Sequence, residues 1–142
     1  MIVYESQDDL TRLINGFANR TLPCHEWTHQ AHLIVGLWYC SHHDATTATD
    51  ILRNCIKQYN IACGKQNTEN SGYHETITLF WVRIIRSYLS KATLECSLVH
   101  LVNDLVTRYS DGKFPFEYYS RDRLMSWEAK TNWIEPDLKP LP

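Results

Sequence analysis

The stretch Cys24-His-Glu-Trp-Thr-His-Gln-Ala-His-Leu-Ile-Val-Gly-Leu-Trp38 decides how the rest of the chain has to fold. Its second half is apolar in almost every direction of a helical wheel, which is typical of a helix buried on all sides. At about 100° per residue, His25, His29 and His32 fall within an arc of roughly 60°. We therefore expect a central helix over 23–41, with a stripe of histidines that needs polar partners inside the protein.

Length and composition limit the class of protein. The chain has 142 residues, of which 44% are hydrophobic, and its 14 basic and 16 acidic residues leave a net charge of −2. That is one ordinary domain with enough apolar residues for a core, not a disordered chain. The charge gives no general attraction to nucleic acid or to anionic membranes, no apolar run is long enough to span a bilayer, and the N-terminus lacks a signal-peptide pattern. We expect a cytoplasmic protein whose partners are neither nucleic acid nor membrane.

Cysteine usage bears on the redox compartment and on metal chemistry. Five cysteines lie mostly among apolar helical residues: Cys24, Cys40, Cys55, Cys63 and Cys96. Five is an odd number, and buried thiols in a reducing cytoplasm fit this pattern. We therefore expect all five to be free thiols. Since no Cys-x-x-Cys pair is present, the sequence argues against a thiolate zinc site.

Apolar residues recur with a helical period along most of the chain, and no segment alternates as a half-buried strand does. This pattern predicts an all-α, single-domain helical bundle over 1–142, with five main helices, a short C-terminal helix and an extended, proline-punctuated tail over 131–142. Besides the central helix, we expect one helix capped by Ser6, one from the Asp44 cap to Gly64, one from about Tyr73, one capped by Thr93 and a short one capped by Ser120. A polar loop over 65–72 precedes the helix that starts near Tyr73.

His25-Glu26-x-x-His29 has the spacing of zinc hydrolases. Two imidazoles one helical turn apart can hold one metal ion, and the intervening glutamate can deprotonate its water. The longer metzincin motif is excluded because His32 stands where it requires glycine, and a gluzincin would have to use Glu75 as its third ligand. Glu26-x-x-His29 is also the spacing of di-iron bundles, but the second such pair is missing. The motif alone therefore leaves the kind of metal site open.

His74 is the histidine outside the central helix that a helical wheel places in an apolar sector. It can be a third metal ligand, or a core-edge histidine bonded to a backbone carbonyl. Glu75 can act as a base, or can simply occupy a first helical turn where the dipole favours a carboxylate. We expect Tyr73 to border the entrance of a site here, and Trp27 to be shared between the core and a ligand pocket.

Several segments resemble a family of uncharacterised small all-helical bacterial proteins. They are Glu26-Trp-Thr-His-Gln-Ala-His-Leu33, Asn67-Thr68, Ser71-Gly-Tyr-His-Glu-Thr-Ile-Thr78 and Trp133-Ile-Glu-Pro-Asp-Leu138. The family pattern is Glu-Trp-Thr-His-x-x-His-Leu with Gly-Tyr-His-Glu-Thr-Ile-Thr, and it has no histidine at the position of His25. The resemblance therefore favours His29, His32 and His74 as the site, and it brings no established activity.

These observations lead to a metal-binding hypothesis. We expect one divalent transition metal (zinc, iron or nickel) on His29, His32 and His74, with Glu26 or Glu75 as a fourth ligand or general base and His25 as a less favoured ligand. Such a site would act on a small molecule, by hydrolysis or by Fe(II)-type chemistry. Two alternatives stay open. One is a metal-free protein that binds a small polar or anionic ligand through its His and Glu side chains, and the other is a purely structural polar network.

Overall fold

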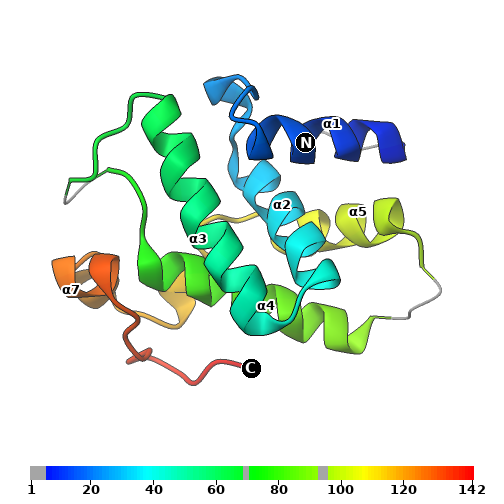
Figure 1. Cartoon of the computed structure of the whole chain (residues 1–142). Coiled ribbons are helices and arrows are strands. Elements are labelled where there is room, and N and C mark those ends of the chain that lie inside the picture. The colour runs from blue at the N-terminus through cyan, green and yellow to red at the C-terminus, as the bar shows by residue number, and fades with distance from the viewer. Residues whose placement is uncertain (1–5, 69–70, 93–95) are drawn as a thin grey trace.

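The computed structural model describes residues 6–68, 71–92 and 96–142. Its helices are α1 (Gln7–Ala18), α2 (His29–His42), α3 (Ala45–Ala62), α4 (Glu75–Lys91), α5 (Leu98–Arg108), α6 (Arg121–Leu124) and α7 (Trp127–Thr131), with 3-10 turns η1 (Cys24–Glu26) and η2 (Phe114–Glu117) (Figure 1). No strand occurs in these described ranges, which confirms the all-α class. Within the same ranges, no helix is long and apolar enough to cross a membrane.

The second helix, α2, is the centre of the bundle, as Figure 1 shows. It packs against α1, α3, α4 and α5. Its buried residues point in every direction around the axis: Ala31, Leu33, Ile34, Val35, Gly36, Leu37, Tyr39 and Cys40. Burying this apolar surface stabilises the fold by roughly 25 cal/mol per Å² removed from water. The four neighbouring helices are thus arranged around one apolar helix, α2, as the sequence predicted.

Most helix starts are fixed by a side chain that accepts a hydrogen bond from the third residue after it. Ser6, Thr28, Asp44, Ser97 and Ser126 each cap a helix in this way. Without such a cap, the first backbone N–H groups of a buried helix would lack partners. The caps therefore decide where each helix begins.

A second, smaller core holds the C-terminal part of the chain against α4. It consists of Phe80, Ile84, Tyr118, Tyr119, Leu124, Ala129 and Ile134. The tail is tied in by hydrogen bonds, among them that from the Tyr119 hydroxyl to the Ile134 carbonyl at 2.7 Å. The α4 helix consequently packs on α2 with one side and on the C-terminal segment with another.

Three predicted helix boundaries differ from the structure. The central helix begins at His29 and not near Pro23, because Thr28 is extended (ψ 172°) and caps α2. The fifth helix begins at Leu98 with Ser97 as its cap, and the predicted cap Thr93 lies outside the described residues. The predicted short helix after Ser120 is divided into α6 and α7, because Ser126 is extended and starts a new helix.

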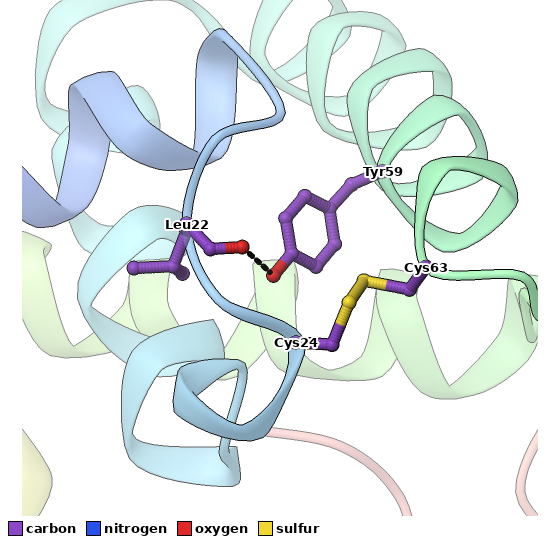
Figure 2. Close-up of a disulfide and its surroundings, with 4 residues drawn as sticks. All are labelled: Leu22, Cys24, Tyr59 and Cys63. Atoms are coloured by element: carbon purple, nitrogen blue, oxygen red, sulfur yellow. Dashed lines mark hydrogen bonds between the residues drawn. A yellow bond between two sulfur atoms is a disulfide. The ribbon is translucent and has the colours of Figure 1, made fainter.

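A disulfide bond joins Cys24 to Cys63, so the expectation of five free thiols is wrong. Cys24 lies in η1 and Cys63 caps the C-terminal end of α3. Figure 2 shows a second tie beside it, the hydrogen bond from the Tyr59 hydroxyl to the Leu22 carbonyl at 2.7 Å. Spacing along the sequence could not reveal this pairing, since it depends on how the chain before α2 lies against the end of α3.

We expect the disulfide to be detectable by thiol counting. Alkylation of the denatured protein without reductant should modify three cysteines per chain, and five after reduction, as measured by intact mass. Because the bond closes a loop of 39 residues, the variant C24S should lose about 2–4 kcal/mol of unfolding free energy. Five modified cysteines in carefully non-reduced protein would contradict the pairing.

Candidate functional site

A cavity of about 70 Å³ lies between α2, α3 and α4. Its walls are formed by His29, His32, Leu33 and Gly36 of α2, Leu52 and Ile56 of α3, and Ile77, Thr78, Trp81, Val82 and Ile85 of α4. The lining is mostly apolar, with two imidazoles, one hydroxyl and one indole N–H as its polar groups. This composition, an apolar wall with a few convergent polar groups, is typical of a small-molecule site.

A larger surface depression of about 300 Å³ lies between the end of α4 and α5. It is lined by charged groups such as Lys91, Asp104 and Arg108 and contains none of the residues that the sequence singled out. Asp104 already accepts hydrogen bonds there from the Tyr88 hydroxyl at 2.7 Å and from Arg108 at 3.1 Å. The cavity beside α2 is therefore the better candidate.

Each of the two cavity histidines has one ring nitrogen fixed by a backbone carbonyl. His29 Nε2 donates to the carbonyl of Tyr109 at 2.8 Å, and His32 Nδ1 donates to the carbonyl of Thr28 at 2.6 Å. Since a carbonyl can only accept, these bonds define which nitrogen carries the proton in the neutral ring. His29 Nδ1 and His32 Nε2 are then left with lone pairs, the arrangement found where a histidine accepts a hydrogen bond or binds a metal.

The surroundings of His32 keep its ring neutral. Trp27 lies against it, with ring centroids 3.8 Å apart. Loss of water around the ring is the main cause that lowers the pKa of His32 to about 4; the bond to Thr28 opposes this shift, and His29 and Lys65 add to it by repulsion. The residue as a whole is nevertheless exposed to solvent. At neutral pH, His32 is therefore an uncharged acceptor that solvent can reach.

His74 does not join the other two histidines. Its Nε2 donates to the carbonyl of Leu124 at 2.9 Å, and its Nδ1 accepts the backbone N–H of Ile77 at 3.1 Å, so the residue caps α4. Both ring nitrogens are occupied, which leaves no lone pair for a metal. Across the described residues, no group of three or more His, Cys, Asp or Glu side chains could hold a metal ion. The structure thus does not assemble the expected three-histidine centre.

Glu75 is held in a network of its own. Arg53 donates to both of its oxygens, at 2.9 and 2.8 Å, and the Tyr73 hydroxyl donates to Oε1 at 2.6 Å. Burial raises the pKa of Glu75, but the bonds from Arg53 and Tyr73 outweigh it, so the net effect lowers the pKa. Neither Glu75 nor Tyr73 lines the cavity. Glu75, Arg53 and Tyr73 thus form an ion pair with an added hydrogen bond, called the Glu75 clamp below, which joins α3 to the start of α4.

The loop before α4 is fixed by a buried lysine. Lys130 of α7 is only 5% exposed and donates to the Asn67 side-chain oxygen at 2.7 Å and to the Tyr73 carbonyl. Burial lowers its pKa. Thr76 adds a further tie, since its hydroxyl donates to the Asn132 carbonyl at 2.7 Å. The segment from Gly72 to Thr76 therefore contacts α3, α6, α7 and the residue after α7.

The remaining predicted site residues lie away from the cavity lining. His25 and Glu26 belong to η1, and the extended Thr28 separates them from α2, so the His-Glu-x-x-His spacing does not lie on one helix. The Glu26 carboxylate lies 4.0 Å from the Arg12 guanidinium. Trp27 is a core residue stacked on Phe17 with ring centroids 4.5 Å apart. Of the predicted site, the structure brings His29 and His32 together in one cavity.

Sequence reasoning did not assign Thr78, Trp81 or Gly36 to the site, although all three line the cavity. Thr78 and Trp81 come from α4, and Trp81 lies 5.0 Å from the His29 ring between centroids. Gly36 follows His32 by four residues; a Cβ there would lie 2.7 Å from Ile85 Cδ1. A glycine on the histidine stripe of an otherwise bulky helix was the one available signal, because it marks a close approach between helices.

We expect Glu75 to contribute to stability through its clamp. E75A removes the partner of Arg53 and of the buried Tyr73 hydroxyl, and should lower the free energy of unfolding by about 1–3 kcal/mol in urea titrations. E26A is the matched control, because an exposed pair at 4.0 Å is worth about 0.5 kcal/mol or less. If both variants lower the free energy of unfolding by the same small amount, the Glu75 clamp does not contribute to stability.

We expect His32 to make stability pH-dependent. Its pKa is about 4 in the folded protein and about 6.5 in an unfolded chain. Between these values the unfolded chain binds a proton that the folded protein does not, so the free energy of unfolding should fall as the pH is lowered from about 6.5 to about 4. H32Q should show a shallower fall in urea titrations across this range. Because the carboxylates are the same in both proteins, superimposable curves would contradict the shift.

Comparison with known proteins assigns no relationship. The chain has no significant match among protein families, curated proteins or solved structures. The resemblance to small helical bacterial proteins therefore stays a prediction. What the protein can bind has to be inferred from the cavity between α2, α3 and α4.

Proposed function

We propose that the protein binds a small, neutral and mainly apolar molecule in the cavity between α2, α3 and α4. The observation that carries this proposal is the pair of histidines in one cavity, each fixed by a backbone carbonyl and each left with one acceptor nitrogen. Such preorganised acceptors are suited to accepting a hydrogen bond from a hydroxyl or N–H group of a ligand. The metal-free alternative left open by the sequence was a small polar or anionic ligand held by His and Glu side chains; the ligand proposed here is neutral and mainly apolar, and Glu75 and His74 are not in its site.

Cavity size limits the ligand to a few non-hydrogen atoms. At about 70 Å³, the space is roughly half that of an engineered protein cavity of about 150 Å³ that binds benzene. A larger ligand could insert only one end. The aliphatic walls of Leu33, Leu52 and Ile56 favour an apolar body,.

The charge state of the site favours an uncharged ligand. A His32 ring with its pKa lowered to about 4 offers no positive charge to an anion at neutral pH. No carboxylate lines the cavity to attract a cation. The polar groups that remain are two imidazoles, the Thr78 hydroxyl and the Trp81 indole N–H. A neutral hydrogen-bond donor therefore matches the site better than the anionic ligand also considered from the sequence.

Pyrrole and furan provide a matched pair of probes, because they have the same ring size but only pyrrole carries an N–H. We expect pyrrole to bind about fivefold more tightly than furan, as one hydrogen bond is worth about 1 kcal/mol. Binding is followed by NMR shifts of the Trp81 indole and the Thr78 amide. H32L should abolish the preference for pyrrole while leaving the aliphatic walls in place.

Two further variants separate this site from the rest of the protein. H74Q alters the α4 cap, whose contact with the cavity lining is the backbone N–H of Ile77; because the glutamine oxygen can accept that bond, the pyrrole preference should stay unchanged. G36A should weaken both probes alike, because its new methyl group displaces Ile85, which lines the cavity. Shifts that appear at Lys91 and Arg108, with none at Trp81, would place the ligand elsewhere and refute the proposal.

A second candidate function is weak binding of a divalent transition metal by His29 and His32. The supporting observation is the same pair of backbone bonds, since metal-ligating histidines commonly donate their other N–H to a carbonyl,. Water would have to complete the coordination of zinc, iron or nickel, because no carboxylate or third histidine lines the cavity. Such a site would be weaker than one with three imidazoles.

Calorimetric titration of the untagged protein with Zn²⁺ and Ni²⁺ decides between the two. A stoichiometric site that is lost in H29Q and in H32Q, but kept in H25Q and H74Q, supports the metal. Loss in H74Q would restore the original three-histidine ligand set. Absence of any site-specific binding, together with a pyrrole preference, leaves the small-molecule function alone.

A further inference from the structure

We propose that Cys24 and Cys63 form a reversible thiol–disulfide exchange site that controls the cavity through the segment between Cys24 and α2. Control of the cavity by this site rests on the proposed function, whereas the thiol–disulfide exchange itself does not depend on it. The reactant is a dithiol, or two equivalents of a small thiol. A cytoplasmic protein, as predicted from the sequence, would have thiols at these positions whenever its surroundings are reducing.

Solvent exposure differs between the two cysteine residues. Cys24 is exposed in η1, and Cys63 is half-buried at the end of α3. Cys40 is buried in α2, and Cys55 lies in the middle of α3, so neither shares this exposed position. Exchange proceeds by attack of a thiolate on the sulfur it can reach. Cys24 is therefore the point of attack.

The chemical step is an exchange of sulfur–sulfur bonds. A thiolate of the dithiol attacks Cys24 Sγ, the Cys24–Cys63 bond breaks, and Cys63 leaves as a thiolate that takes up a proton. In the resulting mixed disulfide, the first sulfur of the dithiol is bonded to Cys24. The second thiolate of the dithiol attacks that first dithiol sulfur, and Cys24 leaves as a thiolate that takes up a proton. The protein disulfide gains two electrons, and the dithiol is oxidised to a cyclic disulfide.

The disulfide is connected to His32 by only a few residues. Trp27 follows Cys24 by three positions and lies on the His32 ring, at 3.8 Å between centroids. Thr28 comes next; its carbonyl accepts the His32 Nδ1 bond at 2.6 Å, and its hydroxyl caps α2 by accepting from Ala31 at 3.2 Å. The segment that the disulfide tethers thus sets both the orientation of His32 and the start of α2.

Trp27 has no anchor of its own. Its indole Nε1 is buried and has no hydrogen-bond partner among the described residues, so its place depends on packing against Phe17, Tyr59 and His32. In the oxidised protein this part of the chain is held against α3 by the disulfide, by the hydrogen bonds from Tyr59 to Leu22 and from Arg20 to Gln58, and by the contact of the Trp27 and Tyr59 rings (Figure 2). Reduction removes the covalent tie next to Trp27 and leaves the Trp27 side chain held by packing.

Amide hydrogen exchange tests the switch without any ligand. On reduction with dithiothreitol, protection of the Ala31 and His32 amides at the start of α2 should fall about tenfold or more, whereas that of Phe80 and Ile84 in α4 should not change. Oxidised dithiothreitol should restore the original protection. The double variant C24S/C63S should behave like the reduced protein without reductant, and C55S like the oxidised one.

Each outcome of this experiment is informative. Unchanged protection of the Ala31 and His32 amides, in protein whose two additional thiols show that the disulfide is reduced, overturns the switch. Global loss of helical circular dichroism on reduction also overturns it, because the disulfide is then needed for the fold itself. Pyrrole should bind the reduced protein at least about fivefold more weakly than the oxidised one. If pyrrole fails to bind the oxidised protein at all, the proposed function fails, while the exchange data still decide the redox site.

Discussion

Burial of α2 on all sides is the constraint on which the rest of this structure depends. A helix surrounded by α1, α3, α4 and α5 has little water along most of its length, so a polar atom that faces the neighbouring helices must find a partner in the protein or pay a desolvation cost. His29 reaches the Tyr109 carbonyl beyond α5, and His32 turns back to Thr28 in its own first turn. These bonds fix the rings and leave acceptor nitrogens beside an apolar cavity.

The segment before α4 shows the same constraint with a different result. His74 caps the helix, Glu75 binds Arg53, and Thr76 holds the chain at Asn132. A buried helix start requires partners for its free N–H groups, and a buried carboxylate requires a cation. Residues that would suit acid–base chemistry are here occupied in joining α3, α4 and the C-terminal segment. Their residue types resemble a catalytic motif because both roles need strong hydrogen-bonding groups.

The sequence predicted the parts of the structure that depend on local periodicity. The helices, the caps Ser6, Asp44 and Ser120, and the pairing of His29 with His32 on one helix follow from residues at most four positions apart. The prediction failed at Thr28, where one extended residue ends the helical register, so His25 leaves the stripe. It left open a backbone carbonyl as the partner of His74 but could not name Leu124, and it failed for the pairing of Cys24 with Cys63. No periodicity encodes such contacts, because they arise only when the helices pack.

Gly36 links the packing of the bundle to the size of the cavity. A side chain at this position would meet Ile85 Cδ1 at 2.7 Å, and both residues line the cavity. A larger residue would therefore have to move Ile85, and the volume available to a ligand would change with the spacing of α2 and α4. Because protein interiors are densely packed, such a shift cannot be absorbed locally. The close contact of the two helices and the small volume beside His32 are thus one structural feature, and a ligand for this site has to fit both.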